Sequence, residues 1–312
     1  MARLYLGVDG GGTNCRVALA DETLTVLAEV KAGRSNLQID EGEPAWNAIG
    51  QGTRAVFAAA GIDFSRTADT YACFGMAGGR LDSARAGFAA RPWPFAGVKV
   101  FDDIDIAHAG ALGGADGGVA IIGTGSAALA IVGGRRFQAG GWGFQIGDQM
   151  SGAILGREVL RHAVEAEDGL RPSTPLTRAV IAELGGDNQA VMGWSFAAGE
   201  DVRIEGDAAR HETLLIGRAP AEFGKLMPLF IRHFEAGDPA AAEIMEIEFA
   251  HIQRYVTWFR GNGADRMAVV GGFGQRLLPL MQQRWGDFCR MPLYEPLTGA
   301  LILARQHFPV GL

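Results

Sequence analysis

Two glycine-rich turns, each standing between two apolar runs, constrain the fold of this 312-residue chain more than any other feature. The first is Asp9-Gly10-Gly11-Gly12-Thr13 and the second is Gly123-Thr124-Gly125-Ser126. Apolar runs on both sides of a glycine cluster predict two strands joined by a tight turn. Glycine allows positive φ and lets backbone N–H groups converge on an anion, so both turns are suited to phosphate.

A single turn of this kind is common in hairpins, but two of them about a third of the chain apart indicate a shared ligand. Neither turn ends in the Gly-Lys-Ser/Thr of a Walker A loop. Residues 123–128 match the loose dinucleotide pattern, with Asp148 near the expected distance downstream. A dinucleotide loop opens a helix, whereas residues 129–134 predict a short strand and a turn. The sequence therefore favours a nucleotide clamp over a dinucleotide site.

The composition limits which classes of partner this chain can be expected to bind. The formal charge of −7 and the scattered Lys and Arg residues argue against a nucleic-acid surface. The longest uncharged stretch, 117–134, is too short and too rich in glycine for a membrane span. We therefore expect a small-molecule partner, no nucleic acid and no membrane. Cys15, Cys73 and Cys289 form no CxxC or zinc-like spacing, and no signal-peptide core precedes the first strand, so we expect a reducing, cytoplasmic setting.

The periodicity predicts an alternation of strands and helices. In the first part we expect three antiparallel strands from Leu4 to about Val30, a helix over 45–60, a buried strand that runs into a loop within 72–79, a strand at 98–101 and a helix over 104–112. The strand, turn, strand signature then repeats, followed by helices over 151–167, 175–184, 189–197, 220–235 and 239–260, a strand at 267–270 and a helix from about 297 to 307. The charged stretch 199–217 breaks this rhythm and is interpreted as an inserted loop.

A repeated unit that begins with strands and continues with helices predicts an α/β fold with two similar cores facing each other. We expect a first domain over 1–116 and a second over 117–296, with the last helix, about 297–308, packing back on the first. The cleft between the domains is the expected ligand site.

These motifs resemble the bacterial glucosamine and N-acetylglucosamine kinases, which carry a BadF/BadG/BcrA/BcrD-type ATPase domain of the actin-like sugar-kinase superfamily. The resemblance covers nearly the whole chain and is carried by residues 7–13, 102–103, 123–126, 140–143, 147–153 and 271–272, with 167–176 similar to the glucosamine kinases in particular. It implies two ribonuclease-H-like (actin-like ATPase) domains with an interdomain cleft. Relatives that activate acyl-CoA dehydratases hold an iron–sulfur cluster at cysteines, and this chain lacks a matching pair.

The resemblance implies an ATP-dependent kinase that phosphorylates an amino sugar at its 6-hydroxyl, with glucosamine first and N-acetylglucosamine as the alternative. A sugar-sensing ATPase without productive transfer is a further alternative, and a homodimer stays open. Asp103, at the end of a predicted strand, is the candidate base, although Asp102, Asp103 and Asp105 together also suit a helix start. Asp9 is the candidate ligand of Mg²⁺, which it is expected to bind through a water molecule. Candidate ATP contacts are Gly11, Gly12, Thr13, Thr124, Gly125, Ser126, Gly271 and Gly272.

Sugar contacts implied by the resemblance are Ser35, Asn36, Trp142, Gly143 and Asp148. Each has a plainer alternative. Asn36 also suits a turn, Trp142 a core aromatic and Asp148 the cap of the helix that follows. Gly271-Gly272 equally suits a packing turn between a strand and a helix.

Overall fold

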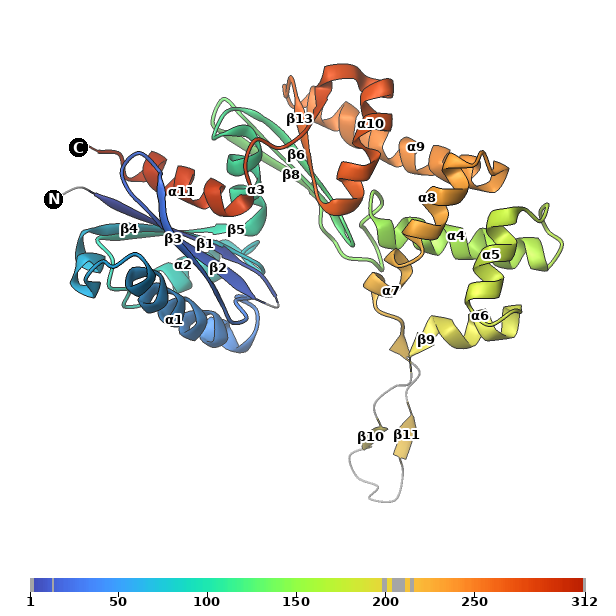
Figure 1. Ribbon diagram of the computed structural model, residues 1–312, viewed down its shortest axis with the longest axis horizontal. Coiled ribbons are helices and arrows are strands. Elements are labelled where there is room, and N and C mark those ends of the chain that lie inside the picture. Colours follow the sequence, from blue (N-terminus) through green and yellow to red (C-terminus); the bar gives the residue numbers. More distant parts are fainter. Residues whose placement is uncertain (1–2, 13, 198–200, 204–210, 214–215, 311–312) are drawn as a thin grey trace.

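The computed structural model describes residues 3–12, 14–197, 201–203, 211–213 and 216–310 (Figure 1). Its strands are β1 (Leu4–Gly10), β2 (Cys15–Ala20), β3 (Val26–Ala32), β4 (Thr70–Met76), β5 (Gly97–Asp102), β6 (Gly117–Ile122), β7 (Ser126–Val132), β8 (Arg135–Gly140), β9 (Phe196–Ala197), β10 (Asp201–Arg203), β11 (His211–Thr213), β12 (Ile216–Gly217), β13 (Met267–Val270) and β14 (Cys289–Arg290). Its helices are α1 (Glu43–Ala59), α2 (Asp82–Ala89), α3 (Asp103–Leu112), α4 (Gly152–Glu167), α5 (Pro175–Glu183), α6 (Asn188–Ser195), α7 (Pro220–Gly224), α8 (Met227–Glu235), α9 (Pro239–Gly261), α10 (Gly272–Trp285) and α11 (Pro296–His307).

The two five-stranded sheets have the same topology. In the first, the order is β3-β2-β1-β4-β5, and in the second, read from its other edge, it is β8-β7-β6-β13-β14. In each sheet the first three strands along the chain form an antiparallel meander, and two later strands add parallel to the first. This confirms the predicted α/β fold with a repeated β-first unit. The strand at 126–132 also confirms that no helix follows the second glycine turn.

Two helices join the sheets, α3 leading from the first to the second and α11 leading back (Figure 1). The two helices pack on each other, and α11 also packs on β1 and β4. Leu297, Ala300 and Leu301 of α11 share a buried cluster with Tyr5 and Ala18 of the first sheet. The backbones of α3 and α11 are in direct contact at Gly299. A Cβ at this position would lie 1.9 Å from the carbonyl oxygen of Ile106.

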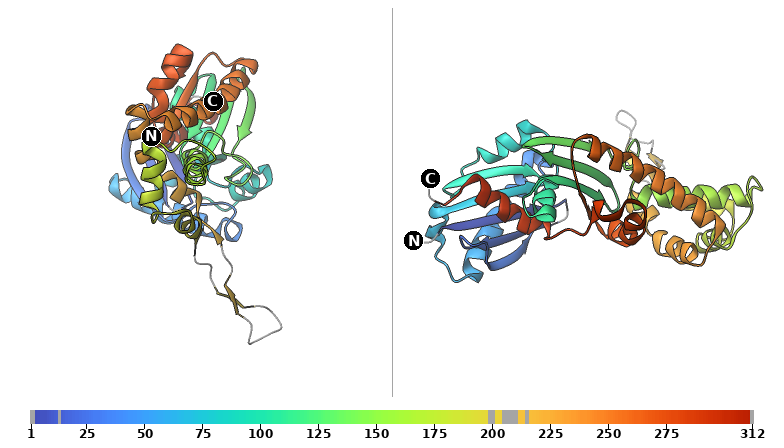
Figure 2. Two further views of the ribbon diagram at one scale, coloured as in Figure 1. Left: turned by 90° about the vertical axis from the view of Figure 1, so that its right-hand side faces the viewer. Right: turned by 90° about the horizontal axis from the view of Figure 1, so that it is seen from above.

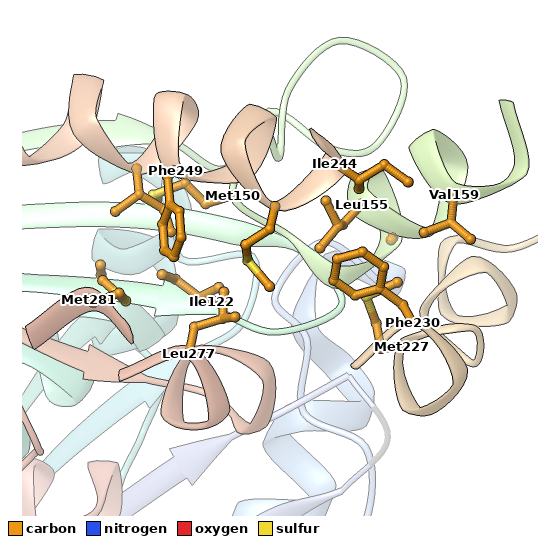
Figure 3. Packing of buried hydrophobic residues seen from close by; sticks show 14 of the residues in the cluster. Ile122, Met150, Leu155, Val159, Met227, Phe230, Ile244, Phe249, Leu277 and Met281 are labelled. Carbon is orange, nitrogen blue, oxygen red and sulfur yellow. The ribbon is translucent and has the colours of Figure 1, made fainter. Parts of the chain in front are cut away.

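The larger core lies in the second half of the chain, where α4, α5, α8 and α9 extend away from the second sheet and give the molecule its long axis (Figure 2). Figure 3 shows this core, with Ile122 of β6, Leu155 of α4, Phe230 of α8 and Ile244 of α9 packed together. Burying each of these large side chains contributes about 1.5–3 kcal/mol. Among the described residues, no helix combines the length and apolar character needed to cross a bilayer.

Several local predictions were wrong. The helix predicted over 220–235 is two helices, α7 and α8, because Pro228 has no N–H to donate and is tolerated only in the first turn of α8. The helix predicted to reach 197 ends at Ser195, and β9 then pairs with β12. Strand β8 and helix α2 were not predicted. The segment interpreted as an insertion, 199–217, holds the short strands β10 and β11 (Figure 1), and its other residues lie partly outside the described part of the chain.

Candidate active site

The second glycine turn is closed by one internal hydrogen bond and fixed to the start of α4 by two more. The N–H of Gly123 donates to the carbonyl of Gly125 at 3.0 Å, and the N–H of Gly152 donates to the carbonyl of Gly123 at 2.9 Å. The buried hydroxyl of Ser126 accepts from the N–H of Met150 at 3.3 Å. These bonds hold the turn rigid between β6 and β7.

The first glycine turn is hydrogen-bonded to the segment that follows β3. Ser35 is fully buried, and both its N–H (3.0 Å) and its hydroxyl (3.2 Å) donate to the carbonyl oxygen of Gly11. Asp9, at the end of β1, accepts from the guanidinium of Arg16 at 3.0 Å. Thr13, a predicted ATP contact, lies outside the described residues.

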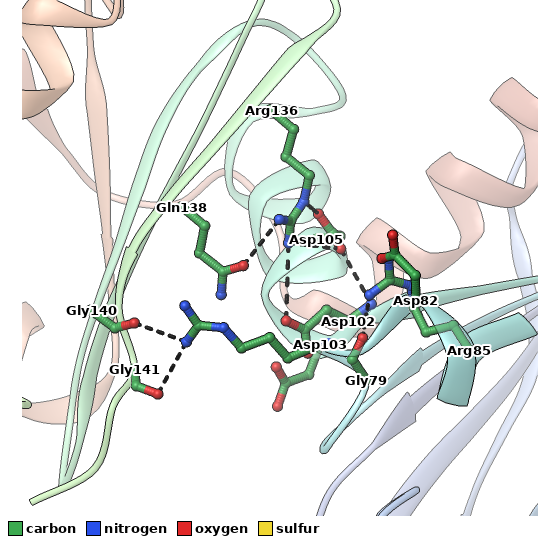
Figure 4. Close-up of polar contacts among 11 residues, drawn as sticks. Gly79, Asp82, Arg85, Asp102, Asp103, Asp105, Arg136, Gln138, Gly140 and Gly141 are labelled. Carbon is green, nitrogen blue, oxygen red and sulfur yellow. Dashed lines mark hydrogen bonds and ion pairs between the residues drawn. The ribbon is translucent and has the colours of Figure 1, made fainter.

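Three carboxylates stand where β5 passes into α3, and the structure gives them different partners. Asp102 is the N-cap of α3 and forms a capping box with Asp105. Asp105 is nearly buried and accepts from Arg136 of β8 at 2.7 Å, while Arg136 lies 4.0 Å from Asp102 (Figure 4). Asp103 is exposed to solvent at the first position of the helix. Capping is therefore carried by Asp102 and Asp105, which leaves the carboxylate of Asp103 available.

The pKa of Asp103 is raised to about 7, mainly because the surrounding protein displaces water from the carboxylate. The negative charge of Asp102 is the next cause, and Asp9 adds a smaller contribution. The backbone N–H of Ile104 acts in the opposite direction. Solvent reaches Asp103, so this carboxylate is partly surrounded by protein and not sealed in a core. A carboxyl group that exchanges its proton near neutrality is suited to act as a general base.

A cleft of about 500 Å³ brings Asp103 together with the second glycine turn. Residues of both halves of the chain line it: Gln38, Gly78, Arg80, Asp102, Asp103 and Ile104 from the first, and Ile121, Gly123–Ala127, Gln138, Gly141, Gly143 and Asp148 from the second. Five predicted site residues on the second half, namely Thr124, Gly125, Ser126, Gly143 and Asp148, therefore share one cavity with the candidate base. Asp148 does not cap α4, because Ser151 does so by accepting from the N–H of Ile154.

A second cavity, of about 580 Å³, continues from this cleft, since Gly123 and Thr124 line both. Its other walls include Gly272 and Phe273 of α10, Lys225 and Arg276. Gly271 has a φ of 101°, and a Cβ there would lie 2.5 Å from the carbonyl oxygen of Ile122. Gly271 therefore lets the start of α10 press directly against the second glycine turn, which places a helix N-terminus beside it.

Other predicted site residues lie next to the cleft rather than in its described lining. Asn36 pairs with Ala77 in a parallel bridge, and its amide oxygen accepts from the N–H of Gln38. Trp142 is 61% exposed, and the guanidinium of Arg80 lies over its ring at 3.8 Å from the centroid.

Asp9, Gly11, Gly12 and Ser35 belong to the first turn and its support, and none of them is among the residues that line the cleft. Asp9 is nonetheless close by, because β1, β4 and β5 lie side by side and end at the same edge: Asp9 pairs with Gly75, which pairs with Phe101, the second residue before Asp103. Its negative charge adds a small contribution to the raised pKa of Asp103.

Sequence reasoning missed Arg80, Gln38 and Gln138 in the cleft and Lys225 and Arg276 in the adjoining cavity. Arg80 donates to the carbonyl oxygens of Gly140 (3.1 Å) and Gly141 (3.2 Å), so it ties the loop after β4 to the end of β8 across the cleft. Its position after Gly78-Gly79, at the carboxyl end of a parallel strand, was the available signal.

Comparisons with known proteins show which family this chain is similar to. The profile of the BadF/BadG/BcrA/BcrD ATPase family matches residues 6–304. The chain is 27% identical over 300 residues to the glucosamine kinase GspK of Vibrio cholerae serotype O1, covering 96% of this chain and 95% of that protein. It is 28% identical over 197 residues to the N-acetyl-D-glucosamine kinase of Dictyostelium discoideum, covering 58% and 60%. The crystal structure named "Putative N-acetylglucosamine Kinase from Chromobacterium violaceum" superposes with a TM-score of 0.74 at 29% identity, covering 97% and 99%.

Proposed function

The chain belongs to the BadF/BadG/BcrA/BcrD ATPase family, and on that premise we propose that it is an ATP-dependent kinase that phosphorylates an amino sugar. One observation carries the proposal: Asp103, a carboxylate whose pKa lies near 7, faces the same cleft as the second glycine turn. The similarity to a glucosamine kinase over nearly the full length of both chains supports the choice of an amino sugar as the acceptor.

In the proposed reaction, Asp103 accepts the proton of the sugar hydroxyl while that oxygen attacks the γ-phosphorus of ATP. The bond from the γ-phosphorus to the β–γ bridging oxygen breaks, and ADP leaves with that oxygen. Backbone N–H groups of Thr124, Gly125 and Ser126 stabilise the charge on the phosphate oxygens. The positions of the two cavities support this assignment. The cavity of about 580 Å³ beyond Thr124 has room for the nucleoside, and the cleft of about 500 Å³ beside Asp103 has room for the sugar.

The residues present fit Mg²⁺ that arrives with the nucleotide rather than a metal held by the protein alone. The described residues contain no group of three acidic, His or Cys side chains able to hold a metal ion. Magnesium is commonly bound through one or two carboxylates, water and phosphate oxygens, and Asp9 at the first turn is the carboxylate we propose for this role. When bound, Mg²⁺ would neutralise phosphate charge.

We propose glucosamine as the first acceptor, phosphorylated at its 6-hydroxyl, with N-acetylglucosamine second. The described lining of the cleft holds three carboxylates, Asp102, Asp103 and Asp148, against one cation, Arg80. An excess of carboxylates favours a protonated amine over a neutral acetamide. Asn36, Trp142 and Gly143 remain proposed sugar contacts, with Asp148 as the acceptor of a sugar hydroxyl. A cytoplasmic location and a homodimer remain part of the proposal.

The test is ADP release measured with glucosamine, N-acetylglucosamine, glucose, mannose and glycerol, beside direct measurement of nucleotide binding. We expect turnover of glucosamine above the other acceptors, and loss of turnover but not of nucleotide binding in Asp103→Asn. If the protein binds ATP but turns over none of these sugars, it is a sugar-sensing ATPase or regulator and not a kinase.

A further inference from the structure

A third cavity, of about 460 Å³, lies where the two sheets and the two joining helices meet, and the proposed mechanism does not use it. Lys99 of β5 and Arg85 of α2 line it from the first half of the chain, Arg136 of β8 from the second, and His307 of α11 closes it. It shares no lining residue with the catalytic cleft. This cavity, defined by these four residues, is called the junction pocket below.

The charged groups of the junction pocket are three cations and two carboxylates. Asp105 is already bound by Arg136, and Asp116 accepts from the N–H of Gly133 at 2.7 Å. Arg85 pairs with Asp82, whose side chain is almost fully exposed. Lys99 has no ion pair within the part of the chain that the structure describes.

Lys99 is exposed on β5 and lines this cavity together with His307. Burial of the His307 ring lowers its pKa, and the charge of Lys99 adds to this effect. His307 also lies against Phe101, with ring centroids 5.2 Å apart. The pocket therefore presents Lys99, a cation without a described ion pair, next to an aromatic and apolar wall formed by Phe101 and Leu303, and Asp116 is the lining carboxylate that pairs with no described cation.

We propose that the junction pocket binds a small phosphate monoester of about the size of a hexose phosphate. Lys99 and Arg136 supply the charge-assisted donors that phosphate oxygens prefer. The apolar wall suits the face of a small organic body better than free phosphate alone, and a volume of this size is in the range of small-ligand sites. If the proposed function holds, the reaction product has this chemistry.

Arg136 connects the junction pocket to the catalytic cleft. Beyond its 2.7 Å bond to Asp105, it lies 4.0 Å from Asp102 and donates to Gln138 at 3.0 Å (Figure 4). Asp102 and Gln138 both line the catalytic cleft. A phosphate that draws the guanidinium toward itself weakens its hold on the carboxylate next to the base. Occupancy of the junction pocket therefore lowers turnover, and this second step rests on the proposed function.

Binding is tested by calorimetry with glucosamine 6-phosphate and, separately, inorganic phosphate, on full-length protein saturated with a non-hydrolysable ATP analogue so that the glycine turns are filled. Lys99→Gln removes the unpaired cation, and Lys31→Gln is the matched control, since Lys31 is an exposed lysine on the opposite edge strand of the same sheet. We expect the ester to bind the protein and Lys31→Gln alike, and Lys99→Gln about tenfold or more weakly. Equal binding by Lys99→Gln, absence of binding, or binding of inorganic phosphate but not of the ester overturns the proposal.

The coupling is tested by initial rates with added ester. We expect inhibition that is not competitive with the sugar and that is lost in Lys99→Gln, whose uninhibited turnover is unchanged. Inhibition that is competitive with the sugar and equal in both proteins overturns the coupling. The calorimetric result does not depend on turnover, so failure of the kinase assignment and failure of the junction pocket are distinguishable.

Discussion

The pH dependence of sugar turnover should follow the ionisation of Asp103. A base acts when it has lost its proton, and a carboxyl group with a pKa of about 7 is about 9% ionised at pH 6 and about 91% ionised at pH 8. We therefore expect kcat/KM to rise about tenfold between these pH values. The assay is ADP release at sugar concentrations below KM, which reports on the free enzyme.

The substrate amine titrates in the same range, so the decisive comparison is between the protein and Asp102→Asn with one and the same sugar. Asparagine keeps the side-chain oxygen that caps α3, but it removes the second largest cause of the raised pKa of Asp103. A neighbouring charge in a cleft that water reaches is worth on the order of 1 kcal/mol, or somewhat under one pH unit. The acidic limb should move to lower pH, with a several-fold gain in relative activity at pH 6.

Asp103→Asn completes the test. It keeps the shape of the side chain and should lower kcat by about 10²–10⁴, with little change in the melting temperature. Two results would refute the reasoning: pH profiles of Asp102→Asn and the unchanged protein that superpose, or an Asp103→Asn variant that retains more than about a tenth of the activity.

Three further outcomes are expected. Glu248 is fully buried in α9 with a raised pKa and no described hydrogen-bond partner. Above pH 4.5 the unfolded chain releases this proton while the folded protein keeps it, so stability falls by about 1.4 kcal/mol per pH unit, and Glu248→Gln should remove that slope in denaturant unfolding. Arg80→Gln loses both hydrogen bonds across the cleft and should raise the KM for the sugar about tenfold, with a smaller change in kcat. A loss of kcat alone would contradict the idea that Arg80 acts by holding the two sides of the cleft together. Gly271→Ala should lower the melting temperature, because its Cβ meets Ile122, while Gly272→Ala, with no atom within 4 Å, should not.

Much of the fold could be predicted because its signals are local. Alternating and continuous apolar runs, with glycine turns between them, predicted the three meander strands of the first sheet and the first two of the second, and the repeat of that pattern indicated the duplicated topology. Strand β8 was missed because three of its six residues are Arg135, Arg136 and Gln138, which give no apolar run at an exposed edge. Helix α2 is short and half polar, and the break between α7 and α8 depends on one proline in a pattern that otherwise continues.

The residues of the candidate site also fall into those that the local sequence indicates and those that depend on long-range packing. Asp103 and the second glycine turn could be proposed from sequence because each follows directly from a strand end. The ties of Arg80 to Gly140 and of Arg136 to Asp105 could not, since they join segments far apart along the chain and depend on how the two sheets face each other. The raised pKa of Asp103 likewise depends on the protein that surrounds the carboxylate, and no local pattern records that.

The duplicated topology also bears on why Asp103, the proposed base, has no cationic partner among the described residues. In each sheet the last parallel strand leads to a helix, β5 to α3 and β14 to α11, so Asp103 and the segment at Glu295 occupy equivalent places. Glu295 stands at the N-cap of α11 without capping it, and its carboxylate pairs instead with Arg16, which also holds Asp9. Arg16 thus neutralises the acid at the second helix start, whereas Arg136 neutralises Asp105 and leaves Asp103 free. The asymmetry of the site therefore arises from the placement of two arginines on a symmetric frame.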